Sequence, residues 1–221
     1  MADSLPNISG ELISFKKGES PIRIIGPISY VFLIVQGAVE LYTVSDKGNK
    51  LIAIYFGEGD IFPISWIINK APEGLFFKAK TDCTLVQYSR DELMNLLPNF
   101  PELSFDLLKR ITSQFGQVSQ RVINLQYPFV RERLASRLII LAEKFGIKSG
   151  DVIELPFFNQ TELASSINVT RESVSRELTR LKKKSLVSYE KNKLKIFDMN
   201  GLYDQLKGNL HSVELIDDMN K

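Results

Sequence analysis

The chain has 221 residues, of which 44% are hydrophobic, and this suits two modest domains or one large one and argues against extensive disorder. A single cysteine, Cys83, excludes an intramolecular disulfide framework. The sequence also has no signal-peptide pattern and no apolar run near about 18 residues. Together with the single cysteine, these features predict a soluble, cytoplasmic protein with no membrane contact. The net charge of +2 by itself excludes no class of partner.

The distribution of charge is more informative than its sum. Residues 1–100 hold 9 basic and 11 acidic side chains, whereas residues 159–197 hold 9 basic and 4 acidic ones. A basic block joined to a weakly acidic part is expected of a nucleic-acid-binding module attached to another domain. A solvated basic surface explains the same numbers, so charge alone does not decide between the two.

Short strands are expected over residues 10–95. Runs such as YVFLIVQGAVELYTV and KLIAIYF, rich in β-branched and aromatic residues, alternate with turn residues. Gly26, Gly37, Gly48 and Gly59 recur every 11 residues, the length of a strand plus its turn, and SDKGNK around Gly48 predicts a hairpin. The pattern predicts a β-sandwich or jelly roll, with or without a ligand.

Residues 99–145 have the periodicity of two helices. Pro128 marks the break between them, and Gly146 stands where a C-cap glycine is expected after the second. The first carries a heptad seam typical of a helix that packs on its own copy, although an amphipathic helix on the β-domain gives a similar pattern. Leu103 and Leu107 suit that second role, and the seam is formed by Leu108, Ile111, Phe115, Val118, Val122 and Leu125.

Residues 159–183 predict a helix-turn-helix. Asn159 and Glu162 form a capping box for a first helix, QTELASSI, that buries Leu163, Ala164 and Ile167. After the turn NVT, Thr170 caps a second helix, RESVSRELTRLKKK. Its apolar face is Val174, Leu178 and Leu181, and its polar face is Arg171, Glu172, Ser175, Arg176 and Thr179. Arginine donates bidentately to guanine and glutamate accepts from cytosine, so this polar face suits the major groove.

A wing is expected after the second helix. LVSYEKNKLKIFD predicts two short strands around EKNK, with lysines able to reach phosphates. Lys182, Lys183 and Lys184 end the helix, where compensation of the helix dipole explains them as well as phosphate binding does.

These segments resemble the CRP/FNR superfamily over about residues 12–198. The similar segments are FKKGES, YVFLIVQGAVELY, FGEGDIF, AKTDCTLVQYSRDEL and, most specifically, QTELASSINVTRESVSRELTRL. The resemblance implies an α+β fold with a β-roll sensor domain over 1–100, a dimerisation helix over 101–127 and a winged helix-turn-helix over 128–221. It also implies a homodimeric transcription regulator that binds double-stranded DNA. The surface loops of such a regulator are expected to contact RNA polymerase. KSGD at 148–151 is one candidate loop, or a plain turn.

By the same resemblance, Arg171, Glu172 and Arg176 occupy base-contacting positions of the cyclic-AMP-responsive branch. Glu172, Ser175 and Arg176 also fit the E-x-x-S-R pattern of the oxygen-responsive branch, which implies palindromes of TGTGA-like or TTGA-like half-sites. The candidate DNA-binding residues are Thr161, Thr170, Arg171, Glu172, Ser173, Ser175, Arg176, Lys182 and Lys193.

The sensor segment departs from the known branches. Pro63-Ile64 and Glu73-Gly74 stand where cyclic-AMP binders have Gly-Glu and Arg-Ser, and a carboxylate repels a cyclic phosphate, so no ordinary cyclic-AMP binding is expected. An amino-terminal cysteine cluster is missing, and the one histidine, His211, lies in the expected tail, so no iron–sulfur or haem cofactor and no metal are predicted. Cys83 suits a buried position better than a redox switch. The aromatic residues Phe62, Trp66, Phe76 and Phe77, with Ile67, either fill the roll or line a pocket for an unknown apolar effector.

Three classes of function compete on these observations. A DNA-binding regulator explains the helix-turn-helix, whereas a cyclic-nucleotide-gated regulatory subunit lacks the phosphate cassette. An enzyme is not expected, because no P-loop, nucleophile elbow or metal-ligand cluster occurs in the sequence.

Overall fold

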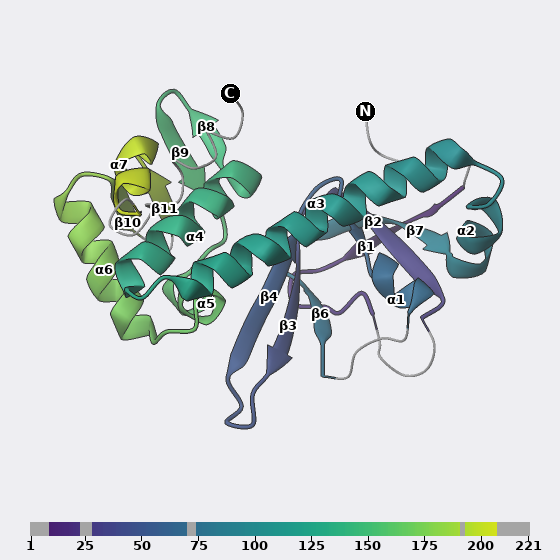
Figure 1. Cartoon of the computed structure of the whole chain (residues 1–221), viewed down its shortest axis with the longest axis horizontal. Coiled ribbons are helices and arrows are strands. Elements are labelled where there is room, and N and C mark those ends of the chain that lie inside the picture. The colour runs from purple at the N-terminus through teal and green to yellow at the C-terminus, as the bar shows by residue number, and fades with distance from the viewer. Residues whose placement is uncertain (1–8, 23–27, 70–73, 191–192, 207–221) are drawn as a thin grey trace, which may run out of the picture. The chain divides into compact units, whose positions relative to one another are not determined.

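The computed structural model describes residues 9–22, 28–69, 74–190 and 193–206 (Figure 1). The chain divides into two compact units, Met1–Arg121 and Val122–Lys221. Gly26, Glu73 and His211, which entered the sequence predictions, lie outside the described residues. Within the described ranges, no helix combines the length and the apolar character needed to cross a membrane.

The first unit is built on two antiparallel sheets, as the strand pattern predicts. One sheet has the order β1-β7-β2-β5 and the other the order β4-β3-β6. The strands are β1 (Glu11–Phe15), β2 (Tyr30–Gln36), β3 (Val39–Val44), β4 (Lys50–Phe56), β5 (Ile61–Phe62), β6 (Phe76–Ala79) and β7 (Cys83–Ser89).

Strand β2 is apolar along nearly its whole length because both of its faces are covered. Val31 and Leu33 point into one core cluster, and Phe32 and Ile34, which alternate with them, point into the other. Continuous rather than alternating hydrophobicity is the pattern expected of a strand that is buried on two sides. This strand therefore forms the wall between the two cores of the unit.

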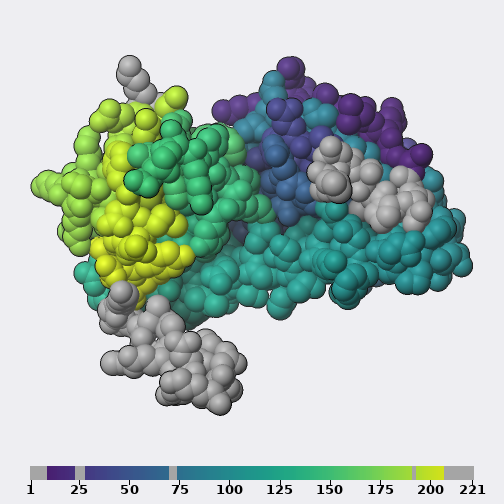
Figure 2. All heavy atoms as spheres, turned by 90° about the horizontal axis from the view of Figure 1, so that it is seen from above, coloured from purple at the N-terminus to yellow at the C-terminus, as the bar shows by residue number. Residues whose placement is uncertain are grey.

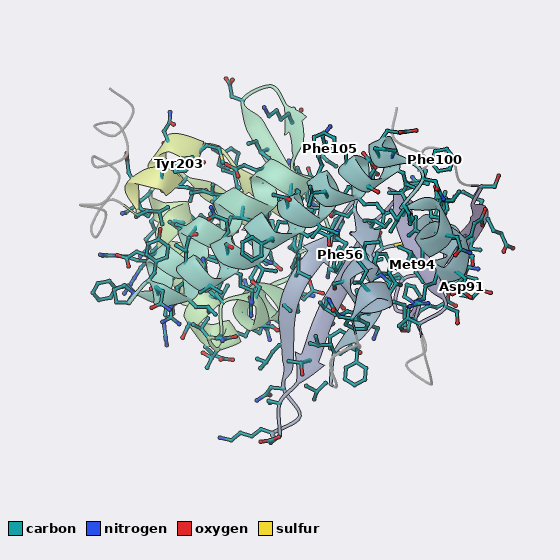
Figure 3. The ribbon with its side chains drawn as sticks, turned by 45° about the vertical axis from the view of Figure 1, so that its right-hand side comes forward. Phe56, Asp91, Met94, Phe100, Phe105 and Tyr203 are labelled. Carbon is teal, nitrogen blue, oxygen red and sulfur yellow. The ribbon has the colours of Figure 1, made fainter. Side chains whose placement is uncertain are left out.

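The core between the two sheets is aromatic. Phe62 stacks on Phe77 with ring centroids 5.0 Å apart, and Phe56 lies 5.4 Å from Phe62. Phe56 is labelled on β4 in Figure 3. Cys83 belongs to the same cluster and is buried, as expected, and burial raises the pKa of its thiol.

Three helices cover the other face of the β1-β7-β2-β5 sheet: α1 (Ile64–Ile68), α2 (Arg90–Leu96) and α3 (Pro101–Gln126). Leu103 and Leu107 of α3 are buried there, as predicted, with Met94 and Phe100 packed alongside (Figure 3). The next turns of α3 bind the start of β5 and the turn before it, because the Arg110 guanidinium donates to the Gly59 carbonyl. The Gln114 amide donates to the Ile61 carbonyl at 2.6 Å.

The predicted hairpin around Gly48 is confirmed. Strands β3 and β4 pair antiparallel, and Gly48 has a φ of +76°, which glycine adopts without steric penalty. The Gly48 N–H donates to the Ser45 carbonyl at 2.8 Å, which closes the turn.

The second unit contains a four-stranded antiparallel sheet, in the order β10-β11-β9-β8, and several helices (Figure 1). Its elements after α3 are α4 (Val130–Phe145), β8 (Ile147–Ser149), β9 (Val152–Leu155), α5 (Gln160–Ser166), α6 (Arg171–Lys183), β10 (Val187–Glu190), β11 (Lys193–Ile196) and α7 (Met199–Asp204). Figure 2 shows the yellow side chains of α7 packed beside the green ones of α4.

The helix break at Pro128 is held by side-chain hydrogen bonds across it. The Asn124 amide donates to the Arg133 carbonyl at 2.8 Å, and Arg133 Nε donates to the Tyr127 carbonyl at 2.7 Å. The chain between α3 and α4 is therefore a defined turn and not a loose linker.

Gly146 ends α4 as predicted, but the reason for glycine differs from the expected one. Its φ is −69°, so the left-handed conformation of common C-caps is not used. A Cβ atom at this position would lie 2.2 Å from the Ala142 carbonyl oxygen and 2.5 Å from Ile153 Cγ2. The last turn of α4 and the packing of β9 against it together therefore exclude a side chain.

Candidate nucleic-acid interface

Helix α5 begins at the predicted capping box. The Asn159 side chain accepts from the Glu162 N–H at 2.9 Å, and the Glu162 carboxylate accepts from the Asn159 N–H at 3.0 Å. Both bonds satisfy backbone donors that a helix start leaves without intrahelical partners. Leu163, Ala164 and Ile167 are buried, as their spacing predicts.

A tight turn connects α5 to α6. Asn168 has a φ of +54°, a conformation that asparagine tolerates better than most residues. Thr170 then caps α6, since its hydroxyl accepts from the Ser173 N–H at 3.2 Å. Side chains next to each helix start therefore fix where α5 and α6 begin, and only a short turn separates the two helices.

Helix α6 has one buried and one exposed face. Val174, Leu178 and Leu181 are all at most 3% exposed, which confirms the predicted inner face. On the opposite side Arg171, Glu172, Arg176 and Thr179 are exposed, and Ser173 and Ser175 are partly buried. In Figure 2 the yellow-green side chains of α6 stand at the outer margin of their unit.

The wing strands β10 and β11 form where they were expected, in the register Glu190↔Lys193, with residues 191–192 outside the described ranges. Tyr189 of β10 ties this wing to α5. The Gln160 backbone N–H donates to the phenolic oxygen of Tyr189. Burial of the phenol raises the pKa of Tyr189, and this effect is larger than the lowering caused by the hydrogen bond. Sequence reasoning did not single out Tyr189, because only the folded register of β10 places it against α5.

The predicted phosphate-binding lysines are exposed, Lys182 in the last turn of α6 and Lys193 at the start of β11. Lys182 pairs with Glu190 at 3.1 Å, and Lys193 pairs with Glu154 at 3.7 Å. The partners Glu190 and Glu154 were not predicted, and Glu154 is too far from Lys193 in sequence for any local pattern to find it. Exposed pairs of this kind contribute at most about 1 kcal/mol to stability, so the lysines can exchange carboxylates for other anions. Thr161 is exposed in the first turn of α5.

The predicted seam on α3 is largely solvent-exposed within the single chain. Phe115 is 70% exposed, Leu108 56%, Val122 55% and Val118 46%, whereas Leu125 is partly buried. Phe105 and Ile123 add two further exposed apolar side chains to the helix, and Phe105 is labelled in Figure 3. Ile111 differs from the other seam residues, because it packs partly against the core that contains Leu107. An apolar row of this length on one helix is unusual for a surface that faces only water.

The four aromatic residues of the candidate effector pocket do not all meet. Phe62 and Phe77 are buried, and Trp66 makes a T-shaped contact with Phe77, with ring centroids 5.0 Å apart, so three of them share the aromatic core. Phe76 points to the other face of β6, is 40% exposed and lies beside Tyr42 at 5.6 Å. The expectation that all four aromatic residues form one group is therefore wrong for Phe76. Adjacent residues of a strand face opposite sides, so Phe76 and Phe77 cannot both point into the core.

Comparison with known proteins agrees with this architecture. Residues 12–99 match the family model of the cyclic nucleotide-binding domain, and residues 132–205 match that of the Crp-like helix-turn-helix domain. The global nitrogen regulator of Synechococcus elongatus is 27% identical over 199 residues, which is 88% of this chain and 89% of that protein. The CRP-like cAMP-activated global transcriptional regulator of Mycobacterium tuberculosis is 22% identical, over 86% and 85% of the two chains.

A solved structure shows the same fold. The CRP/FNR-family transcriptional regulator from Thermus thermophilus superposes with a TM-score of 0.73 at 23% identity, over 90% of this chain and 99% of that one. The matched proteins are regulators and not enzymes, in agreement with the sequence analysis. With a nucleotide-binding-type β-roll followed by a winged helix-turn-helix whose second helix has an exposed polar face, the chain belongs to the CRP/FNR family of DNA-binding transcription regulators.

Proposed function

We propose that the protein binds a palindromic DNA site as a homodimer, with one α6 helix in the major groove of each half-site. The observation that carries this proposal is the exposed polar face of α6, which presents Arg171, Glu172 and Arg176 opposite a buried apolar face. By the family resemblance, TGTGA-like or TTGA-like half-sites suit these three side chains. Arginine reads guanine O6 and N7, and glutamate accepts from cytosine N4.

Phosphate contacts orient the helix on the duplex. The hydroxyls of Thr161 and Thr170 lie at the starts of α5 and α6, where the positive end of the helix dipole also favours an anion. Lys182 and Lys193 extend this anion-binding surface along the wing. These contacts position the protein without reading sequence, so base preference depends on α6.

The exposed apolar face of α3 is the proposed dimer interface. Pairing α3 with its copy removes Leu108, Phe115, Val118 and Val122 from water, and burial of apolar surface stabilises association by about 25 cal/mol per Å² before the losses of freedom on binding. The two α6 helices then reach half-sites about 34 Å apart, one helical turn of DNA.

The β-roll is proposed as the sensor, for a signal other than cyclic AMP. Ile64 stands at a position where the family's cyclic-AMP binders have a polar cassette, and its side chain is buried in the core beside Ile67. An apolar effector would act by favouring the dimer geometry in which both helices fit successive grooves. We expect no heat of binding when cyclic AMP is titrated into the protein.

Selection from a random pool of double-stranded DNA tests the proposed function. The purified, ligand-free protein is expected to enrich a palindrome with two half-sites of about four to five base pairs, about one helical turn apart. A Glu172→Ala, Arg176→Ala double variant provides the matched control, because it keeps the buried face of α6 and should enrich nothing. Enrichment of the same motif by the control, or of unrelated single sites by the wild-type protein, would refute recognition through α6.

A further inference from the structure

Three side chains in the first two turns of α6 are joined by hydrogen bonds. Arg176 Nη2 donates to Ser173 Oγ at 3.1 Å, and Ser173 Oγ lies 3.1 Å from Thr170 Oγ1. The Ser173 backbone N–H also donates to Thr170 Oγ1, at 3.2 Å. The base-contacting position is thus connected, through one serine, to the residue that caps the helix.

The direction of the bond between Arg176 and Ser173 follows from the chemistry of the groups. A guanidinium only donates, so Ser173 Oγ must accept from Arg176. The hydroxyl hydrogen of Ser173 is then free to be donated to Thr170 Oγ1, which receives the backbone N–H as well. When Ser173 donates in this way, both acceptor sites of Thr170 are used, and the Thr170 hydroxyl hydrogen is left for a DNA phosphate to accept.

A neutral partner holds Arg176 without neutralising it. Arg180, one turn further along α6, is instead paired with the carboxylate of Glu177 at 2.8 Å. A carboxylate competes with a guanine for the guanidinium fork, whereas a serine hydroxyl occupies one N–H donor and leaves the others available. The arrangement around Arg176 therefore restricts its rotamers while preserving its capacity to read a base.

We propose that Ser173 is a positioning residue for sequence recognition, which holds the Arg176 guanidinium in its base-reading pose before DNA is bound. The inference rests on the proposed function, because it takes Arg176 as a base reader. A long exposed side chain loses rotamer freedom when it is ordered by a ligand, and a tether in the free protein lowers that loss. Ser173 thus contributes to base preference without touching a base.

The DNA test compares Ser173→Ala, which removes the acceptor, with Ser173→Thr, which keeps a hydroxyl at the same position. Affinities are measured for the enriched site and for sites changed at the base pair read by Arg176, at several salt concentrations. Ser173→Ala should lower the preference for the correct base pair about three- to tenfold, as expected for loss of one hydrogen bond, with the salt dependence unchanged. Ser173→Thr should restore the preference.

A direct phosphate contact by Ser173 has a different signature. It predicts an equal loss on all sequences and a salt slope that is shallower by about one unit, and that result would overturn the positioning role. An unchanged base preference in Ser173→Ala would overturn it as well. Thermal unfolding of both variants shows whether a loss reflects folding, and alanine is a better helix former than serine, so α6 should persist.

A measurement without DNA separates this inference from the proposed function. The ¹⁵N–¹H nuclear Overhauser effect of Arg176 Nε–Hε reports the order of the side chain on the picosecond to nanosecond timescale. It should fall in Ser173→Ala and stay near the wild-type value in Ser173→Thr. Equal values in all three proteins would refute the tether, whether or not the wild-type protein enriches a DNA site, and failure of that enrichment alone would refute only the proposed function.

Discussion

At the scale of single residues, Arg176 is the side chain on which sequence recognition is expected to depend most directly. Arg176→Ala should weaken binding to the enriched site by about 1–3 kcal/mol and relax preference at one base pair of each half-site, because a bidentate arginine–guanine contact is lost. Gel-shift titrations against the enriched site and a scrambled duplex measure both effects.

Arg176→Lys is the matched control for that change. It keeps the positive charge but replaces the planar fork by a point charge, so affinity for scrambled DNA should stay near the wild-type value while base preference falls. If Arg176→Ala loses equal affinity on both duplexes, Arg176 acts on phosphates and not on a base.

Gly146 shows the limit of residue patterns at this scale. Its place after an amphipathic helix predicts a C-cap, and the structure confirms that α4 ends there. A side chain at position 146, however, is excluded because it would clash with Ala142 and Ile153, and not because the backbone is left-handed. Local sequence indicates where a helix ends, but part of the reason for the glycine is a remote strand, β9, that packs on the helix end.

At the scale of elements, the capping box of α5 is expected to stabilise the whole second unit. Asn159→Ala removes the side chain that accepts from the Glu162 N–H at 2.9 Å, and loss of such a cap lowers the free energy of unfolding by about 0.5–2 kcal/mol. Urea denaturation followed by circular dichroism measures the change.

Asn159→Asp should retain nearly full stability, because aspartate caps helices about as well as asparagine. The cap lies outside the proposed base-reading face of α6, so the base preference of the folded Asn159→Ala protein should be close to that of the wild type. Equal stability of the alanine and aspartate variants would contradict a capping contribution.

At the scale of the whole molecule, the apolar face of α3 is expected to join two copies of the chain. Phe115→Asp and Val118→Asp place a charge at side chains that are 70% and 46% exposed in the single chain. Burying an unpaired carboxylate in an apolar interface is strongly unfavourable, so both variants should be monomers. Light scattering on a size-exclusion column measures the mass.

Ser113→Asp tests whether any charge on α3 has the same effect. Ser113 is exposed on the same helix but outside the row of apolar residues, so this variant should remain a dimer. Dimer mass in Phe115→Asp and Val118→Asp would place the interface elsewhere. Because two half-sites are read together, a monomer should also bind the palindrome much more weakly than the wild type.

The sequence by itself determined the elements and their order, and with them the family. Caps such as Asn159 and Thr170, the heptad spacing on α3 and the period of α6 are all local patterns, and each appears in the structure at the predicted residues. They are readable in advance because hydrogen bonds and side-chain neighbours within a helix join residues three or four apart.

Only the tertiary structure decided which distant groups meet. It placed Glu154 beside Lys193, Tyr189 against the start of α5, and Phe77 rather than Phe76 in the aromatic core. It also divided α3, whose Ile111 packs on the core while Phe115 stays exposed. The physical reason is that strand register and burial depend on how remote segments pack together, and a one-residue change of register reverses every side chain of a strand.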